Sequence, residues 1–320
     1  MLALPAWFDA ADHDGRWERW LGGAETLDAA FAELLVAARH RPERATELVR
    51  PHIGTTPEWR QRLLTLMEWS LTPGLVDLAV DLIQSGQADE ARGPLANNSD
   101  FWPLLYGLSE TAPVPAARLV GAYLDRAWTQ ELPAGPSKLF GSEYLSAHSQ
   151  TASAVLSRIA EAAPKPYVDN ILPFVLRTAE SDDASDERSG NRWLYRQWGG
   201  SSVGAELLSS LDTALRALPA ADPAAAVDAL TRLRGSATEI ARFLACRLYT
   251  VLGAADEALD WLCSDQRNLV WAGWTVPAGR LVNSSRPPRP TAPQRTQRAH
   301  DPATPHRSSG PRPLAIRPPP

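Results

Sequence analysis

The sequence contains almost no lysine. Lys138 and Lys165 are the only two, so arginine supplies 30 of the 32 basic side chains. A phosphate-binding loop needs a glycine-rich turn that leads into a lysine followed by serine or threonine. Neither lysine lies in such a setting, which excludes a P-loop of the chain's own.

Residues that form metal and nucleophile sites are also scarce. Cys246 and Cys263 are the only cysteines. Both lie among apolar residues, so we expect two buried free thiols, with a disulfide or redox pair as the alternative. No histidine pair has zinc-binding spacing, and in Asp12-His13-Asp14 adjacent side chains point apart. No Gly-x-Ser-x-Gly motif occurs. We expect no metal, no cofactor and no enzymatic activity.

Long apolar runs are absent as well. No stretch of 18 apolar residues occurs, so we expect no membrane-spanning helix and no membrane partner. The N-terminus has no basic segment and becomes acidic within ten residues, unlike a signal peptide. A cytoplasmic location is the expectation.

The acidic charge is unevenly distributed. Residues 286–320 hold seven arginines and one acid, Asp301, which leaves 25 basic and 36 acidic side chains in residues 1–285. The net charge of residues 1–285 is therefore −11. Broad binding to nucleic acid needs a basic face, so the acidic body argues against it. The basic tail would attract at most a weak anionic partner.

What the chain does contain is a succession of amphipathic segments. Apolar residues recur with a helical period of about 3.6 residues in four clear stretches: 25–40, 114–131, 203–218 and 236–252. No sustained alternation of strand type occurs. Three polar residues stand before a proline, as at helix starts: Thr56-Pro57, Thr72-Pro73 and Asp222-Pro223.

Further signals mark where helices begin and end. Ser236-x-x-Glu239 has the pattern of a capping box. Three glycines stand where helices are expected to end: Gly86, Gly235 and Gly253. In the C-terminal part of the array, every second expected helix begins about 32–34 residues after the one before it. This spacing suits stacked helix pairs.

These patterns predict an all-α protein, an irregular α-solenoid of antiparallel helix pairs with a disordered Pro/Arg-rich C-terminal tail. A closed bundle is the alternative. We expect an N-terminal array over 1–180, a polar and aromatic loop over 181–202, a C-terminal array over 203–284 and the tail over 285–320.

Tryptophan is abundant, with 12 residues. Four of them lie on or beside apolar helix faces and are expected in the core: Trp59, Trp69, Trp128 and Trp261. The loop combines aromatic and basic side chains, the types that dominate binding surfaces. Its candidate partner-binding residues are Arg192, Trp193, Tyr195, Arg196 and Trp198. The alternative is that these rings fold back into a groove between helices.

The tail holds 11 of the 28 prolines and has P-x-x-P spacings, such as Pro287–Pro290. Such segments favour polyproline II and dock in aromatic grooves. A shifted reading frame in GC-rich DNA yields a similar Pro/Arg/Ala/Thr mixture. The tail is therefore either a genuine linker or ligand segment, or a frameshift product on a truncated array.

Residues 254–274 resemble the helical regions of actinobacterial ATP-binding proteins of the STAND/NACHT type. The matching pieces are Asp260-Trp261-Leu262 and Asp265-x-Arg267-Asn268-Leu269. In that family a P-loop ATPase is followed by a helical array that senses a ligand, often in phage defence. The resemblance implies a sensor array, and it brings no ATP chemistry because the P-loop is missing.

The sequence thus predicts a non-catalytic scaffold or sensor module that binds a protein partner. The second reading is a truncated sensor region of a larger STAND/NACHT-type ATPase.

Overall fold

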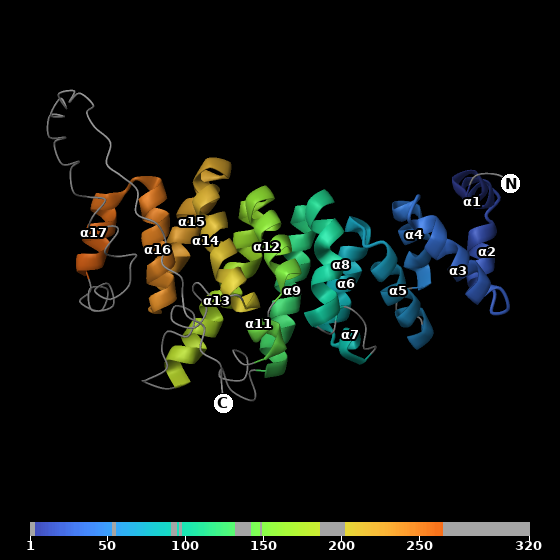
Figure 1. The fold of residues 1–320 in the computed structure, drawn as a ribbon, viewed down its shortest axis with the longest axis horizontal. Helices are drawn as coiled ribbons and strands as arrows, with labels where there is room; N and C mark the ends of the chain where they lie inside the picture. Colours follow the sequence, from blue (N-terminus) through green and yellow to red (C-terminus); the bar gives the residue numbers. More distant parts are fainter. Residues whose placement is uncertain are drawn as a thin grey trace, which may run out of the picture. The chain divides into compact units, whose positions relative to one another are not determined.

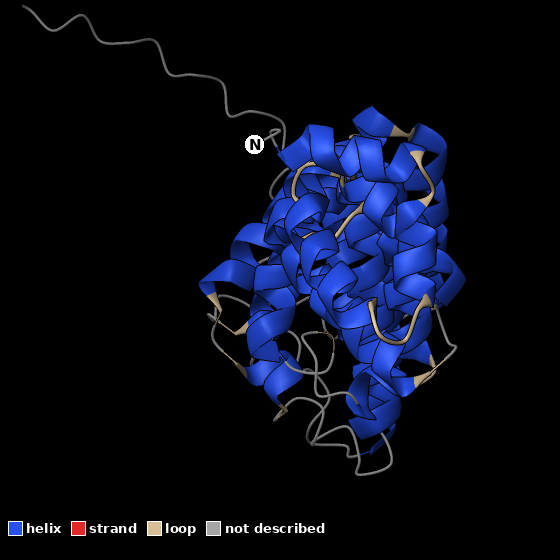
Figure 2. Cartoon of the chain, turned by 90° about the vertical axis from the view of Figure 1, so that its right-hand side faces the viewer, coloured by secondary structure: helices blue, strands red, loops and turns tan. Residues whose placement is uncertain are grey.

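The computed structural model describes residues 4–52, 56–90, 95, 98–131, 142–147, 149–185 and 202–264. Helices are the regular elements of these residues, and no strand occurs among them (Figure 2). The all-α prediction is therefore confirmed.

The helices run in chain order through residues 4–264. Their bounds are α1 Leu4–His13, α2 Arg16–Gly22, α3 Leu27–Ala38, α4 Pro42–Val49, the 3₁₀ turn η1 Arg50–His52, α5 Pro57–Trp69, α6 Pro73–Gln84, α7 Gln87–Glu90, α8 Asn98–Thr111, α9 Pro113–Glu131, α11 Glu143–Ser146, α12 Gln150–Ala162, α13 Pro164–Ser185, α14 Val203–Ala221, α15 Pro223–Gly235, α16 Glu239–Leu252 and α17 Ala255–Ser264. All four stretches with helical period lie on such helices, namely α3, α9, α14 and α16.

Helices pack mainly on neighbours that are close in the chain (Figure 1). At the N-terminal end α1 contacts α2, α2 contacts α3, and α3 contacts α4 and α5. In the middle α9 contacts α6, α8, α12 and α13. Towards the C-terminal end α14 contacts α12, α13, α15 and α16, and α16 contacts α17. Helices thus pack both on consecutive helices, such as α13 on α14, and on helices further along the chain, such as α6 on α9 and α9 on α13.

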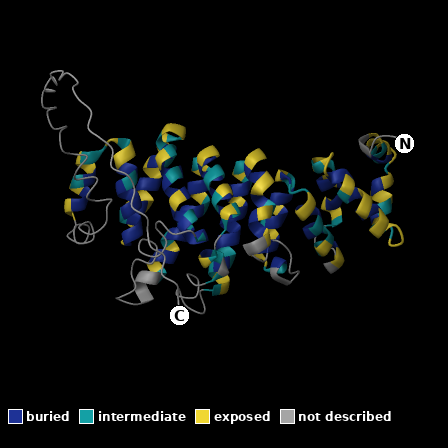
Figure 3. Cartoon of the chain, in the orientation of Figure 1, coloured by how far each residue is buried: buried dark blue, intermediate teal, exposed yellow. Residues whose placement is uncertain are grey.

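The buried side chains form a layer that continues from helix to helix, while exposed residues cover the outer faces (Figure 3). Aromatic rings fill the junction of α8 and α9. Phe101 stacks on Tyr123 with ring centroids 3.7 Å apart, and Trp102 meets the same tyrosine at 6.1 Å. All three side chains are at most 1% exposed. Burial of each ring contributes about 2–3 kcal/mol.

The helix starts at prolines were predicted correctly. Thr56 and Asp222 each accept a hydrogen bond from a backbone N–H of the helix that follows. Pro73 also begins a helix, but the Thr72 side chain does not cap it. Its hydroxyl lies 3.0 Å from that of Thr46 on α4 instead, so it links two helices.

The capping box was placed two residues too early. Thr238 is the N-cap of α16 and accepts from the N–H of Ala241. Ser236 donates a hydrogen bond to Glu180 of α13 instead, because it ends the preceding helix. Among the glycines, Gly86 and Gly253 adopt the left-handed φ values of +76° and +67° expected at helix ends. Gly235 also lies at a helix end, as the last residue of α15, but it has no positive φ, so only the left-handed conformation was predicted wrongly there.

The chain divides into two units, Met1–Ser285 and Arg286–Pro320, and the second lies outside the described residues. The predicted loop start at residue 181 was wrong, because residues 181–185 still belong to α13. Residues 186–201 lie outside the described part. No helix of the described residues is long and apolar enough to cross a membrane.

Candidate functional site

The five loop residues singled out for partner binding, Arg192, Trp193, Tyr195, Arg196 and Trp198, lie outside the described residues. The same combination of aromatic and charged side chains occurs at two other places in the structure. One is a pocket near the N-terminus, and the other is a set of exposed aromatic–arginine pairs.

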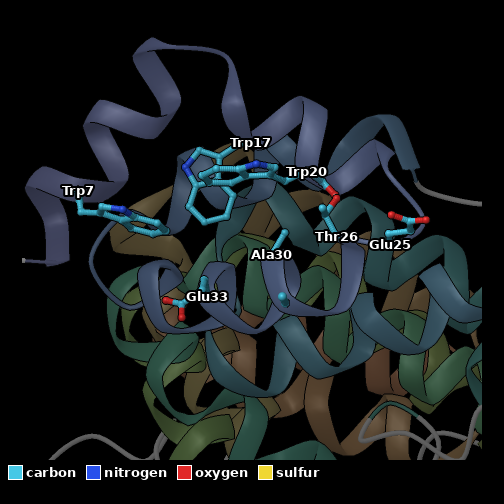
Figure 4. A pocket seen from close by; sticks show the side chains of 8 residues that line it. Trp7, Trp17, Trp20, Glu25, Thr26, Ala30 and Glu33 are labelled. Atoms are coloured by element: carbon cyan, nitrogen blue, oxygen red, sulfur yellow. The ribbon is translucent and has the colours of Figure 1, made fainter.

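The pocket opens where α1 and α2 cross α3, and its volume is about 300 Å³. Its lining, which defines the tryptophan pocket, is Trp7, Trp17, Trp20, Glu25, Thr26, Ala29, Ala30 and Glu33. Figure 4 shows the three indoles on the side of α1 and α2, with Ala30 and Glu33 of α3 facing them. The small side chains of Ala29 and Ala30 leave the space that the rings do not fill.

The three indoles have a defined mutual arrangement. Trp7 and Trp20 are nearly parallel, with an interplanar angle of 16° and centroids 6.2 Å apart. Trp17 stands almost perpendicular to both, at 85° and 83°. Its indole N–H donates to the carbonyl oxygen of Phe8 over 3.3 Å, so its polar atom is satisfied inside the protein. The side of the pocket that α1 and α2 form is therefore aromatic, while α3 and the turn before it add two alanines, one threonine and two glutamates.

Ion pairs hold α1 and α2 in place against α4. Arg44 donates to the carboxylate of Asp12 over 2.7–3.0 Å and lies 3.2 Å from Glu18. Arg41 donates to both carboxylate oxygens of Asp9 over 2.8 and 2.9 Å. These bonds raise the pKa of both guanidinium groups, so each arginine stays charged. Asp12 is thus an arginine partner.

The rim of the pocket is acidic. Glu25 and Glu33 are exposed, and the described part of the chain offers neither of them a basic side chain within ion-pair distance. Thr26 donates to the carbonyl oxygens of Trp20 and Gly23 over 2.8 and 3.1 Å, which ties the turn to the end of α2. The pocket thus combines electron-rich rings with two carboxylates.

Exposed aromatic rings carry arginine side chains at two places along the helices. Trp69 at the end of α5 is 45% exposed, and the Arg39 guanidinium lies 4.4 Å from its ring centroid. Tyr106 on α8 is 46% exposed, and Arg158 of α12 lies 4.6 Å above it. Arg39 directly follows α3 and Arg158 lies on α12, so neither arginine shares a helix with its ring. These are cation–π contacts that leave apolar surface open to solvent.

The prediction that four tryptophans are core residues is partly wrong. Trp59 and Trp261 are buried, at 5% and 9% exposure. Trp128 is half-buried and lies under Arg177. Trp69, the last residue of α5, is exposed.

The cysteines also differ from expectation. Both are free, as predicted, but only Cys246 is buried, and Cys263 is exposed near the end of α17. Burial raises the pKa of the Cys246 thiol to about 12, so it is not a nucleophile at neutral pH. Among the described residues no group of three or more His, Cys, Asp and Glu side chains is arranged to hold a metal ion.

The sequence analysis did not single out Trp7, Trp17 and Trp20. The signal that points to them is the spacing of Trp17 and Trp20, which stand three residues apart and therefore share a helix face. No protein-family model, curated protein or solved structure matches this chain.

Proposed function

We propose that this protein is a non-catalytic scaffold or sensor module that binds a protein partner on an irregular α-solenoid of antiparallel helix pairs. The packing of helices mainly on others close to them in the chain supports the solenoid. An array of this kind presents side chains from many helices on one surface, so a partner can be bound without a deep pocket.

One observation carries the binding proposal. Trp69 and Tyr106 are large aromatic side chains that stay almost half exposed, and each is covered on one face by an arginine. Trp, Tyr and Arg supply most of the energy in protein–protein interfaces because they bury a large area with few rotatable bonds. A ring held by an arginine loses less freedom on binding, which favours association.

The partner is expected to be a protein rather than nucleic acid, because the body that carries these pairs has a net charge of −11. Arg39 is exposed and would contact an acidic side chain of the partner, whereas Arg158 is half-buried and already donates to the Tyr106 carbonyl oxygen and the Ser109 hydroxyl over 3.2 and 3.3 Å. The disorder of residues 285–320 and a weak anionic ligand for them stay predictions, as does the cytoplasmic location.

The test compares two double variants of the full chain. Trp69→Ala with Tyr106→Ala removes the proposed contact rings. Val227→Ala with Val251→Ala removes exposed apolar side chains of α15 and α16 and is the matched control. Both should unfold at nearly the same temperature as the unmodified chain. Quantitative mass spectrometry of captured proteins should show at least one partner lost about tenfold with the ring variant only. Equal loss of the partner with both variants, or no loss with either variant, refutes the proposal.

The resemblance of residues 254–274 to STAND/NACHT-type proteins supports a second proposal, a truncated sensor region of a larger ATPase, often a phage-defence protein. Its piece Asp260-Trp261-Leu262 lies on α17, where Trp261 and Leu262 are buried and Asp260 is exposed. The remaining piece lies outside the described residues. This proposal requires a P-loop ATPase encoded in or beside the same gene. Sequencing the flanking DNA in all reading frames checks it, and the absence of any ATPase there would refute it.

A further inference from the structure

We propose that the tryptophan pocket binds an arginine side chain of a protein partner. The proposal concerns α1–α3, and it goes beyond the exposed pairs on α5 and α8 without depending on them. It starts from the lining, which joins aromatic rings to two carboxylates and contains no basic side chain. Elsewhere in the structure, surroundings of this kind hold an arginine.

Three arginines of the described residues each lie over an aromatic ring and pair with a carboxylate at the same time. Their guanidinium carbons are 4.6–5.9 Å from the ring centroids, within the range of cation–π contacts. The three sets are Arg62 with Trp59 and Asp28, Arg158 with Tyr106 and Glu110, and Arg177 with Trp128 and Asp125.

The tryptophan pocket has the ring and the carboxylate of such a set. Among the described residues, no arginine lies over Trp7 or Trp20 and none pairs with Glu33. An arginine of a partner would therefore complete in this pocket the arrangement that the chain forms three times with its own side chains.

Trp7 and Trp20 supply the aromatic surface. Both are half-buried, whereas Trp17 is fully buried and packs edge-on against them with centroids 5.5 and 5.6 Å away. The rings thus form one continuous wall, which faces α3 across the pocket (Figure 4). A guanidinium group is planar and stacks flat on the open part of such a wall, so the rings need not surround it.

Helix α3 supplies the hydrogen-bond acceptor. Glu33 stands four residues after Ala29 and three after Ala30, so the three residues share one face of the helix. The small alanines leave room for the methylene stem of an arginine, and the Glu33 carboxylate accepts two parallel N–H bonds from its head. Glu25, just before α3, adds negative potential at the rim.

These features favour arginine over other side chains. A lysine ammonium is a compact, strongly hydrated charge with no flat face to stack on an indole. An acidic side chain would meet two carboxylates, and a neutral apolar one would gain nothing from them. The pocket volume of about 300 Å³ is at the small end for ligand sites and suits a single side chain.

The pocket is formed before a partner arrives. The Trp17 indole donates to the carbonyl oxygen of Phe8, and the Thr26 hydroxyl donates to that of Trp20. The ion pairs described above hold α1 and α2 against α4. A preformed site loses little conformational entropy on binding.

The experiment titrates the ¹⁵N-labelled full chain with N-acetylarginine amide at constant ionic strength and follows the indole N–H resonances. The Trp7 and Trp20 signals should shift with a Kd on the order of 10 mM, as expected for one cation–π contact and one exposed ion pair. N-acetylcitrulline amide has the same planar head without the charge and should bind at least about fivefold more weakly. N-acetyllysine amide should bind about threefold more weakly.

Two variants test the contacts. Glu33→Gln should raise the Kd about threefold, and Glu161→Gln, an exposed glutamate on α12, is the matched control that should leave it unchanged. Trp7→Leu, checked for folding by circular dichroism, should raise the Kd about fivefold. No saturable shift up to about 50 mM, or equal affinity for citrulline or lysine, would overturn the proposal. An unchanged Kd in Glu33→Gln would do the same.

Further measurements identify the occupant. Free arginine that binds at least about fivefold more tightly than the capped residue would assign the pocket to a small molecule and overturn the protein source. A dimer in sedimentation velocity that Glu33→Gln dissociates would identify a second copy of the chain and overturn the assignment to another protein. Trp69→Ala with Tyr106→Ala should leave probe binding unchanged, so failure of this inference would leave the proposed function standing.

Discussion

The buried carboxylate of Asp212 offers the sharpest test of how the C-terminal helices are held together. It is 2% exposed on α14 and accepts hydrogen bonds from Nε and Nη2 of Arg247 on α16 over 2.9 and 2.8 Å. Nη2 of Arg216 lies 2.7 Å from the same carboxylate. Asp212 raises the pKa of Arg247, which therefore stays charged. Asp212→Ala would leave that charge without its partner.

The expected loss of stability depends on how far the Arg247 side chain is exposed to water. Removing one partner of a buried ion pair costs about 3–5 kcal/mol. The Arg247 side chain is 18% exposed and regains some water, so we expect Asp212→Ala to lower the free energy of unfolding by about 3 kcal/mol. Arg216 is 49% exposed, and Arg216→Ala should cost less than about 1 kcal/mol. Urea titrations followed by circular dichroism measure both.

Hydrogen exchange then shows where the loss acts. In a solenoid each unit is stabilised chiefly by its neighbours, so amide exchange in Asp212→Ala should accelerate in α14–α16 and remain unchanged in α3–α5. A closed bundle would lose protection throughout. A cost below about 1 kcal/mol for Asp212→Ala would refute the reasoning about the buried pair, and uniform acceleration would refute the solenoid.

Two further predictions concern close packing and thiol chemistry. A Cβ on Gly121 would lie 2.9 Å from Cβ of Asn170, so Gly121→Ala should destabilise the α9–α13 contact by about 1–3 kcal/mol. Gly107 has open space, and Gly107→Ala should stabilise by about 0.5–1 kcal/mol; equal effects in thermal unfolding would contradict this. At pH 8 a disulfide reagent should label Cys263 rapidly and Cys246 only after denaturation, since burial raises the pKa of Cys246 to about 12. Rapid labelling of both thiols in the folded protein would contradict this prediction.

The helices could be predicted from the sequence because their signals are local. A 3.6-residue apolar period and a polar residue before proline depend on the same chain segment that forms the helix. This is why the starts of α5, α6 and α15 were correct. The start of α16 was missed because Ser236 and Thr238 are both able to cap. The choice between them depends on Glu180 of α13, which is far away in sequence.

The candidate site could not be predicted in the same way, because it depends on packing between helices. Trp7 and Trp17 lie ten residues apart and meet because α1 packs on α2. The exposure of Trp69 likewise could not be read from its place on an apolar helix face. The sequence pointed to Trp and Arg as binding residues, and that chemistry recurs in the pairs on α5 and α8. The five loop residues it named stay a prediction.

The central claim is that the exposed aromatic–arginine pairs contact a protein partner. The most direct measurement places a photoreactive phenylalanine analogue at position 106 of the full chain, and at position 227 as control. Illumination in cells should link a discrete partner band to position 106 and none to position 227, and Trp69→Ala should weaken that link. Identical crosslinks from both positions, or none from position 106, would contradict the account.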